Sequence, residues 1–241
     1  MRPDSHAIVR LDPDGNEALT LGGDGPEEGG MNYPVQLVST SEGRLVVVEA
    51  GGGVLSVYDA DGAFVRNIGE AGHGPGQLYM AADAVVDSMG YILVADTGNN
   101  RIQVFEEETG EHAWSFGQLG QEEGDLNGPR SLTIDHEGYV HVVDSGNARV
   151  CVFTPGGRFE RCYGNDGTNA LVAPRAVSID PLGNSWVSDP VAAVVQVYAP
   201  DGSHLARFES LTLDGIQVQP LRVALTPDDT FYIQVNLVEV D

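Results

Sequence analysis

Short apolar runs joined by polar loops recur along the chain, and they predict paired β-strands. The stretch "YILVADTGNNRIQVF" (91–105) is apolar on both sides of its loop, and "YVHVVDSGNARVCVF" (139–153) repeats this pattern 48 residues later. The same apolar frame recurs with weaker loops at 44–58 and 184–198. No long window has the period of a helix, so we expect an all-β protein built from a repeat.

Glycines mark the end of each repeat unit and give its length. Successive ones are separated by 47, 48 and 47 residues: Gly22, Gly69, Gly117 and Gly164. Each full unit holds four strand candidates, and the turn between its last two strands ends in glycine, as in "DADG", "EETG", "TPGG" and "APDG". A left-handed residue in that position is typical of a type I turn with a bulge. The sequence therefore predicts successive four-stranded antiparallel sheets.

Four antiparallel strands that repeat every ~40–50 residues are typical of a β-propeller blade. Neighbouring blades cover both faces of a blade, which explains why "LVVV" (45–48) is apolar without alternation. The stretches "GHGPGQL…YILVADTGNNRIQVF" and "GPRSLTIDHEGYVHVVDSGNARVCVF" resemble NHL repeats, most strongly within residues 69–164. This resemblance implies a β-propeller. Similar repeats occur in RNA-binding proteins, protein-binding modules and a few lyases, so function has to be argued from the site.

Each end of the chain matches only part of a unit. Residues 6–22 match the last two strands, and residues 219–235 match the first two. We therefore expect one domain over residues 1–241 with five blades, the last closed by strands from both termini. Closure would provide hydrogen-bond partners for backbone N–H and C=O groups that an open sheet edge exposes. The alternative is a fragment of a longer propeller of the six-bladed type.

The charge of the chain narrows the class of partner. Thirty-six acidic residues against 12 basic ones give a formal net charge of −24, and all 12 basic residues are arginine. Such a surface repels phosphate backbones and anionic lipid headgroups, so we expect neither nucleic-acid nor membrane binding. The acidic residues are spread through every repeat, which suits a halophilic, monomeric protein. We expect no signal peptide or membrane span in this sequence, and the compartment stays open.

The two cysteines lie on the two strands of one predicted hairpin. A two-residue turn at Gly156 and Gly157 would place Cys151 opposite Cys162 in a hydrogen-bonded pair. The Cα separation in such a pair is about 5.5 Å, which is the less usual geometry for a bridge between strands. We therefore expect free, buried thiols.

The polar loop after the second strand carries an Asp, an Asn and an Arg at the same spacing in two consecutive units, and weaker versions of it occur in the other two. The Asp can accept hydrogen bonds from backbone N–H groups of the loop, and the Arg five positions later can pair with a carboxylate or carbonyl. Recurrence in consecutive units indicates a structural brace rather than an active site. The residues assigned to it are Asp96, Asn99, Arg101, Asp144, Asn147, Arg149 and Asp189, with Glu49 at the equivalent position of the first unit.

A metal site is not indicated. In the NHL-like peptide-amidating lyases a zinc-binding histidine follows the proline of an inner strand, and here those positions read "YPVQ", "MAAD", "GPRS", "APRA" and "QPLR". The histidines fall in different strands and turns: His6, His73, His112, His136, His141 and His204. The chain also has no nucleophile elbow or phosphate loop. We expect no metal and no cofactor.

Three arginines share a place in the repeat. The two positions after the inner-strand proline are expected to line the mouth of the central channel, and they include Arg130, Arg175, Arg222, Gln36, Asp83 and Ser131. The arginines either pair with carboxylates of the protein itself or bind an anion from outside. Bidentate geometry favours a carboxylate or a group of phosphate size.

These observations favour a non-enzymatic binding or scaffolding propeller that holds a protein, a peptide or a small anionic ligand on one face. The alternative is a metal-dependent enzyme of the lyase or lactonase kind with its site at the channel mouth. A third possibility is a bare propeller that serves as an assembly unit. Stoichiometric divalent metal in the purified protein would separate the enzyme from the binding module.

Overall fold

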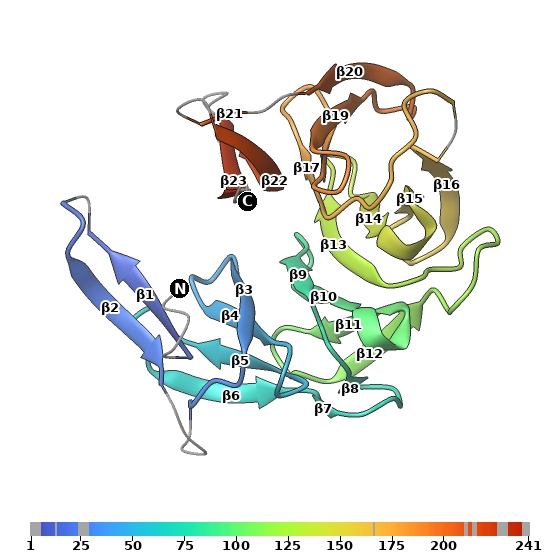
Figure 1. Cartoon of the computed structure of the whole chain (residues 1–241). Helices are drawn as coiled ribbons and strands as arrows, with labels where there is room; N and C mark the ends of the chain where they lie inside the picture. Colours follow the sequence, from blue (N-terminus) through green and yellow to red (C-terminus); the bar gives the residue numbers. More distant parts are fainter. Residues whose placement is uncertain are drawn as a thin grey trace. The chain divides into compact units, whose positions relative to one another are not determined.

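The computed structural model describes residues 6–12, 14–23, 29–165, 167–209, 212–213, 216–225 and 231–237. In these ranges the chain forms β-strands, turns and two short 3₁₀ helices, as expected for an all-β protein (Figure 1). None of the described helices is long and apolar enough to cross a membrane. The chain divides into two compact units, Met1–Ser115 and Phe116–Asp241, and each is described by itself.

The first unit begins with the two-stranded sheet of β1 (Ala7–Leu11) and β2 (Glu17–Gly22). Two four-stranded antiparallel sheets follow, and each runs in chain order across the sheet. Their strands are β3 (Pro34–Ser39), β4 (Leu45–Glu49), β5 (Val54–Tyr58), β6 (Phe64–Ile68), β9 (Asp83–Val86), β10 (Tyr91–Asp96), β11 (Arg101–Glu106) and β12 (His112–Phe116). The short strands β7 (Glu70–Ala71) and β8 (Gln77–Leu78) pair in parallel, and η1 (Thr97–Asn99) follows β10.

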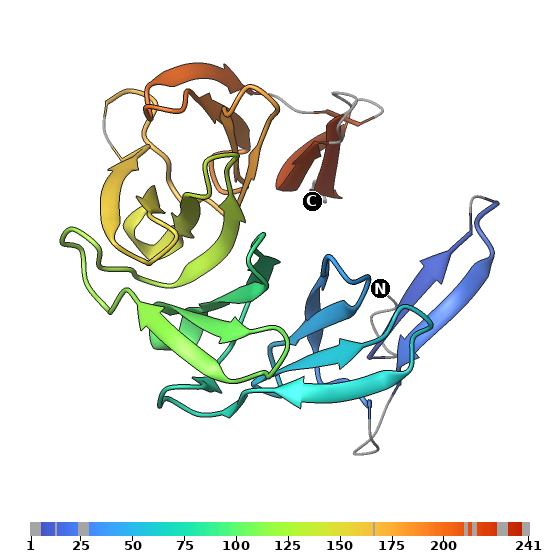
Figure 2. The ribbon, with the colours of Figure 1, turned by 180° about the vertical axis from the view of Figure 1, so that it is seen from behind.

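The second unit holds two further four-stranded sheets and a three-stranded one (Figure 2). The strands of the four-stranded sheets are β13 (Pro129–Ile134), β14 (Val140–Asp144), β15 (Arg149–Phe153), β16 (Phe159–Tyr163), β17 (Ala176–Ile179), β18 (Ser185–Asp189), β19 (Val194–Tyr198) and β20 (His204–Phe208). The last sheet contains β21 (Thr212–Leu213), β22 (Ile216–Leu225) and β23 (Phe231–Leu237), and η2 (Ser145–Asn147) follows β14.

The first strands of successive sheets are neighbours within each unit. Strand β3 contacts β9 in the first unit, and in the second unit β17 contacts both β13 and β22. Four-stranded meanders that pack in succession through their first strands are the blades of a β-propeller, so the predicted fold class is confirmed. The number of blades and the closure of the last one remain predictions.

The core of each unit lies between its sheets. In the first unit it includes Val46, Val48, Leu55, Ile92 and Val94, all fully buried. In the second unit an equivalent cluster contains buried apolar side chains of β14, β15, β18 and β19. The second and third strands of each four-stranded sheet are therefore buried on both faces, which explains their unbroken apolar sequence.

The glycine turns adopt the predicted left-handed conformation. Gly62, Gly157 and Gly202 have φ angles of 87°, 82° and 88°. The turn between β11 and β12 is one residue longer than its counterparts, since Glu106 N donates to the carbonyl of Glu111, whereas Asp59 N donates to that of Ala63. This extra residue accounts for the one repeat of 48 residues rather than 47.

The prediction of free thiols is wrong, because Cys151 and Cys162 form a disulfide. The expected two-residue turn is replaced by a longer one, in which Thr154 N donates to the carbonyl of Arg158, and the strand register shifts between Val152 and Phe153. The shift changes the phase of the hydrogen-bond ladder. The cysteines remain opposite each other with Cα atoms 4.0 Å apart, as in the narrow, non-hydrogen-bonded type of pair.

Candidate functional site

The recurring polar loop is a buried hydrogen-bond network around Asp96 in the first unit. Asp96 Oδ2 accepts hydrogen bonds from Arg101 Nε at 2.9 Å and from Gln103 Nε2 at 3.0 Å. Asn99 Nδ2 donates to the same carboxylate and to the carbonyl of Gly72. Arg101 Nη2 also donates to the backbone carbonyls of Gly74 and Gln77. The side chains of the loop thus bind it to the segment before β9.

Asp144 repeats this arrangement in the second unit. Its Oδ2 accepts from Arg149 Nε and Asn147 Nδ2, both at 2.8 Å. Asp189 instead accepts from the backbone N–H groups of Val172 and Ala173. These contacts occupy the carboxylates with partners inside the protein, which fits a brace better than a catalytic group.

The principal backbone donor to each carboxylate differs from the sequence expectation. In four repeats it lies on the segment before the first strand of the sheet, 17 residues upstream, and not in the loop that follows: Asn32 N to Glu49, Tyr79 N to Asp96, Asn127 N to Asp144 and Val172 N to Asp189. From a following loop, Ala192 N donates to Asp189 at 3.1 Å. The carboxylate therefore fastens the entry of each blade to its second strand.

Arg130, Arg175 and Arg222 all belong to the second unit, and we call them the arginine cluster. Arg130 is the second residue of β13, and a register shift between Pro129 and Ser131 leaves it outside the pairing with β14. Arg175 directly precedes β17, and Arg222 lies within β22 opposite Gln234 of β23.

Buried Ser188 of β18 anchors two of these segments. Arg175 N donates to the Ser188 carbonyl at 2.8 Å, and Ser188 Oγ donates to the carbonyl of Leu221, next to Arg222, at 3.0 Å. The backbone beside both arginines is thereby fixed to one strand.

The guanidiniums of the arginine cluster influence one another. The pKa of Arg175 lies below its ordinary value, because partial burial disfavours its charge and because the positive charges of Arg130 and Arg222 repel it. Arg175 is exposed over part of its surface although its guanidinium is partly desolvated, and Arg130 is also exposed. Neither guanidinium forms a hydrogen bond or an ion pair with any residue in the described ranges. The cluster is thus a concentration of positive charge with two unneutralised members.

The other residues predicted for this ring are divided between the units. Ser131 is buried beside Arg130 in β13, whereas Gln36 of β3 and buried Asp83 of β9 belong to the first unit. Asp83 Oδ1 accepts a hydrogen bond from Ala84 N at 3.0 Å. The structure brings the three arginines of the second unit together, and the grouping of all six residues remains a prediction.

The histidines have separate partners. His73 contacts Asn99, His112 contacts Ser115, and His136 contacts the carbonyl of Asp180. His141 is buried between Asp135 and Tyr163. In the described ranges no three His, Cys, Asp or Glu side chains are placed so that they could hold a metal ion.

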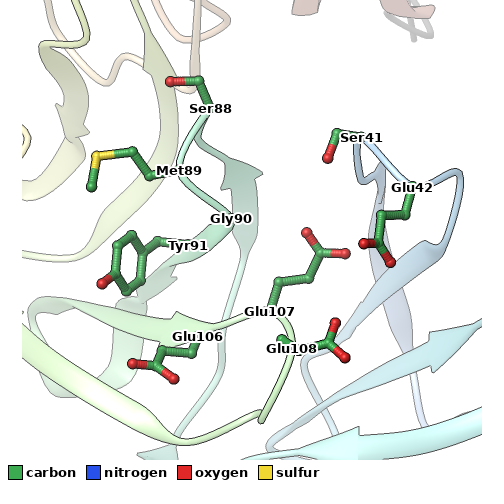
Figure 3. Close-up of a pocket in the computed structure, with 9 residues that line it drawn as sticks. All are labelled: Ser41, Glu42, Ser88, Met89, Gly90, Tyr91, Glu106, Glu107 and Glu108. Atoms are coloured by element: carbon green, nitrogen blue, oxygen red, sulfur yellow. The ribbon is translucent and has the colours of Figure 1, made fainter.

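The first unit contains a polar hollow that the sequence motifs did not reveal. This acidic pocket of about 330 Å³ is lined by Ser41, Glu42, Ser88, Met89, Gly90, Tyr91, Glu106, Glu107 and Glu108 (Figure 3). Its walls are the β3–β4, β9–β10 and β11–β12 turns. The signal that could have indicated it is the extra residue in "EETG", which lengthens the last of these turns.

The comparisons with known proteins agree with the fold. The NHL repeat family matches residues 78–105. NHL repeat-containing protein 3 of Mus musculus is 30% identical over 117 residues, and that of Homo sapiens is 31% identical over 120 residues. The alignments take in 45% and 46% of this chain but 34% and 35% of those proteins, so the chain spans about a third of the length of these relatives.

Solved structures extend the likeness over most of the chain. A protein of unknown function from Bacteroides caccae has a TM-score of 0.69 at 16% identity, covering 94% of this chain and 78% of its own. Virginiamycin B lyase from Staphylococcus aureus has a TM-score of 0.66 at 13% identity, covering 84% of this chain and 63% of its own. Such identities show a shared fold and carry no function with them. Together with the matched repeat, they show that the chain contains an NHL repeat and has a β-propeller fold.

Proposed function

We propose that this propeller is a binding module that holds an anionic group of a protein, a peptide or a small ligand on its arginine cluster. The observation that supports this function is that Arg130 and Arg175 are exposed and lack an ion pair with any described residue. In a chain with 36 acidic residues, carboxylate partners for an arginine are plentiful. Two arginines without one are therefore available to a partner from outside.

The electrostatics of the cluster favour an anion of limited size. Guanidiniums that lie close enough to lower the pKa of Arg175 repel one another, and a bound carboxylate or phosphate group would offset that repulsion. A planar guanidinium binds such a group with two parallel hydrogen bonds. A long polyanion would bring further negative charge against a protein whose net charge is −24, so a single acidic group is the better fit.

The enzyme alternative rests on the fold shared with a lyase. A metal-dependent lyase or lactonase needs a set of converging ligands, and the described ranges provide no three His, Cys, Asp or Glu side chains that fit such a set. Elemental analysis of the purified protein tests this alternative directly. One divalent metal ion per chain, retained through dialysis, would favour the enzyme over the binding module.

Calorimetric titration with succinate, inorganic phosphate and N-acetyl-glutamate amide tests the binding proposal. We expect one of these probes to bind at low salt, and Arg130→Ala and Arg175→Ala each to weaken that binding at least tenfold. Arg158→Ala is the matched control, because Arg158 is exposed and already paired with Glu160 at 2.6 Å. Equal losses in all three variants, or no binding of any probe at millimolar concentration, would contradict the proposal.

A further inference from the structure

The acidic pocket of the first unit contains a buried carboxylate with one oxygen that lacks a hydrogen-bond partner. The side chain of Glu107 is 8% exposed, and its Oε1 atom has no hydrogen-bond partner. Arg44 forms an ion pair with it, but its Nη1 lies 3.7 Å away, beyond hydrogen-bond distance. Burying a carboxylate oxygen without a hydrogen bond is unfavourable, so this atom is suited to a donor that arrives from outside.

The pocket carries more negative than positive charge. Arg44 is shared among three glutamates, with Nη1 3.2 Å from Glu108 and Nη2 3.0 Å from Glu42 in addition to the longer contact with Glu107. Arg66 donates to the backbone carbonyl of Glu107 and not to its carboxylate. One guanidinium thus serves several carboxylates, and the surplus charge attracts a further cation.

The fold positions Glu107 through the one irregular turn of the repeat. Glu107 N donates to the carbonyl of Gly90 at 2.8 Å, which holds the lengthened β11–β12 turn against the β9–β10 turn. In Figure 3 the side chain of Glu107 rises into the space between Ser41 and Gly90, whereas the carboxylate of Glu106 points away from it. The lengthened turn therefore places Glu107 in the lining of the pocket.

We propose that the acidic pocket binds an alkylammonium or guanidinium group, presented by a basic peptide side chain or by a small amine. A bare metal ion is less suitable, because no three described carboxylates are placed to coordinate one. An organic cation needs only hydrogen-bond acceptors and an apolar wall for its stem. Glu107 and Ser41 line the pocket and offer acceptors, and Met89 and Tyr91 are the large, partly apolar residues of its lining. A volume of about 330 Å³ accommodates the end of a lysine or arginine side chain.

The proposal is tested by titrating the whole protein with N-acetyl-arginine amide, butylguanidinium and, as an uncharged control of similar length, N-acetyl-norleucine amide. The two cations should bind, and norleucine should not. Glu107→Gln keeps the shape of the side chain and should weaken binding at least tenfold. Glu111→Gln, the matched control on an exposed glutamate of the same turn that does not line the pocket, should change affinity less than twofold. If only the peptide-like probe binds, the source is a protein side chain, and if butylguanidinium binds as well, a small amine suffices.

Arg44→Gln separates a binding site from a purely structural ion pair. If the pocket receives an external cation, removal of the resident guanidinium frees its carboxylates, and affinity should rise severalfold. If Glu107 serves only to hold Arg44, neither Arg44→Gln nor Glu107→Gln will alter binding, and the proposal fails. It also fails if Ca²⁺ displaces the organic cations stoichiometrically, or if no cationic probe binds at millimolar concentration. Melting curves of each variant verify that it is folded.

Discussion

Arg149 donates a hydrogen bond from Nε to Asp144 Oδ2 at 2.8 Å, and the pair joins β14 to β15 inside the second unit. The side chains are 9% and 0% exposed. Removal of one partner from a buried pair leaves an uncompensated charge, which costs about 3–5 kcal/mol. We therefore expect Arg149→Ala to lower the free energy of unfolding by that amount, measured by urea denaturation. Arg158→Ala, which removes an exposed ion pair, should change it by less than about 1 kcal/mol.

The sequence predicted the repeated features of this protein and missed those that break the repeat. The brace residues Asp96 and Asp144 follow from fixed spacing, because an equivalent place in each blade gives an equivalent environment. The disulfide depends on a register shift between Val152 and Phe153, which spacing does not reveal. The burial of Glu107 depends on one extra residue in a turn, whose effect is set by packing against Gly90. Irregular positions are decided by tertiary contacts rather than by local pattern.

The disulfide predicts a measurable dependence on reductant. It joins residues 11 positions apart, and closing a loop of that length in the unfolded chain is worth about 2–3 kcal/mol. We expect dithiothreitol to lower the melting temperature of the wild type but not that of a Cys151→Ala/Cys162→Ala variant. Thiol titration in denaturant without reductant should find no free thiol. Two thiols per chain would show that the cysteines are free.

Closure of the last blade by both termini predicts that deletion of residues 1–22 abolishes cooperative folding or causes aggregation, because sheet edges are then left unpaired. The deletion also removes packing, since Leu19 and Leu21 lie against Val47 and Tyr58 in the first unit. Leu19→Ala/Leu21→Ala is therefore the control: it loses this packing but keeps the strands. The control should still melt cooperatively at a lower temperature. A deletion variant that behaves like the control would contradict closure.

The net charge of −24 predicts that salt stabilises the protein. Repulsion among dispersed carboxylates destabilises the folded state at low ionic strength, and salt screens it. We expect the melting temperature at pH 7 to rise steadily as KCl goes from about 0.01 M to about 1 M, where the Debye length falls from ~30 Å to ~3 Å. Near the isoelectric point of 4.3 the same series should be much flatter, because little net charge remains to be screened. Equal slopes at both pH values would show that the salt effect is not electrostatic.

His141 predicts a loss of stability on mild acidification. Burial lowers its pKa below the ordinary value of 6.5, partly opposed by the hydrogen bond and charge of Asp135 and assisted by the charge of Arg161. The unfolded chain therefore takes up a proton at this histidine at a higher pH than the folded chain does. The contribution of the neutral imidazole is complete above pH 6.5 and declines as pH falls from 6.5 toward the folded-state pKa.

A His141→Gln variant should lose this part of the pH dependence. Chemical denaturation between pH 7.5 and pH 5.5 should show the free energy of unfolding of the wild type falling more steeply than that of the variant. His136→Gln replaces an exposed histidine in the neighbouring turn and should retain the wild-type slope. The contacts of His141 with Asp135 at 3.1 Å and with Tyr163 at 3.2 Å will make the variant less stable overall. The decisive quantity is thus the slope of the free energy of unfolding with pH and not its absolute value. Identical slopes in all three proteins would show that His141 does not titrate as its burial requires.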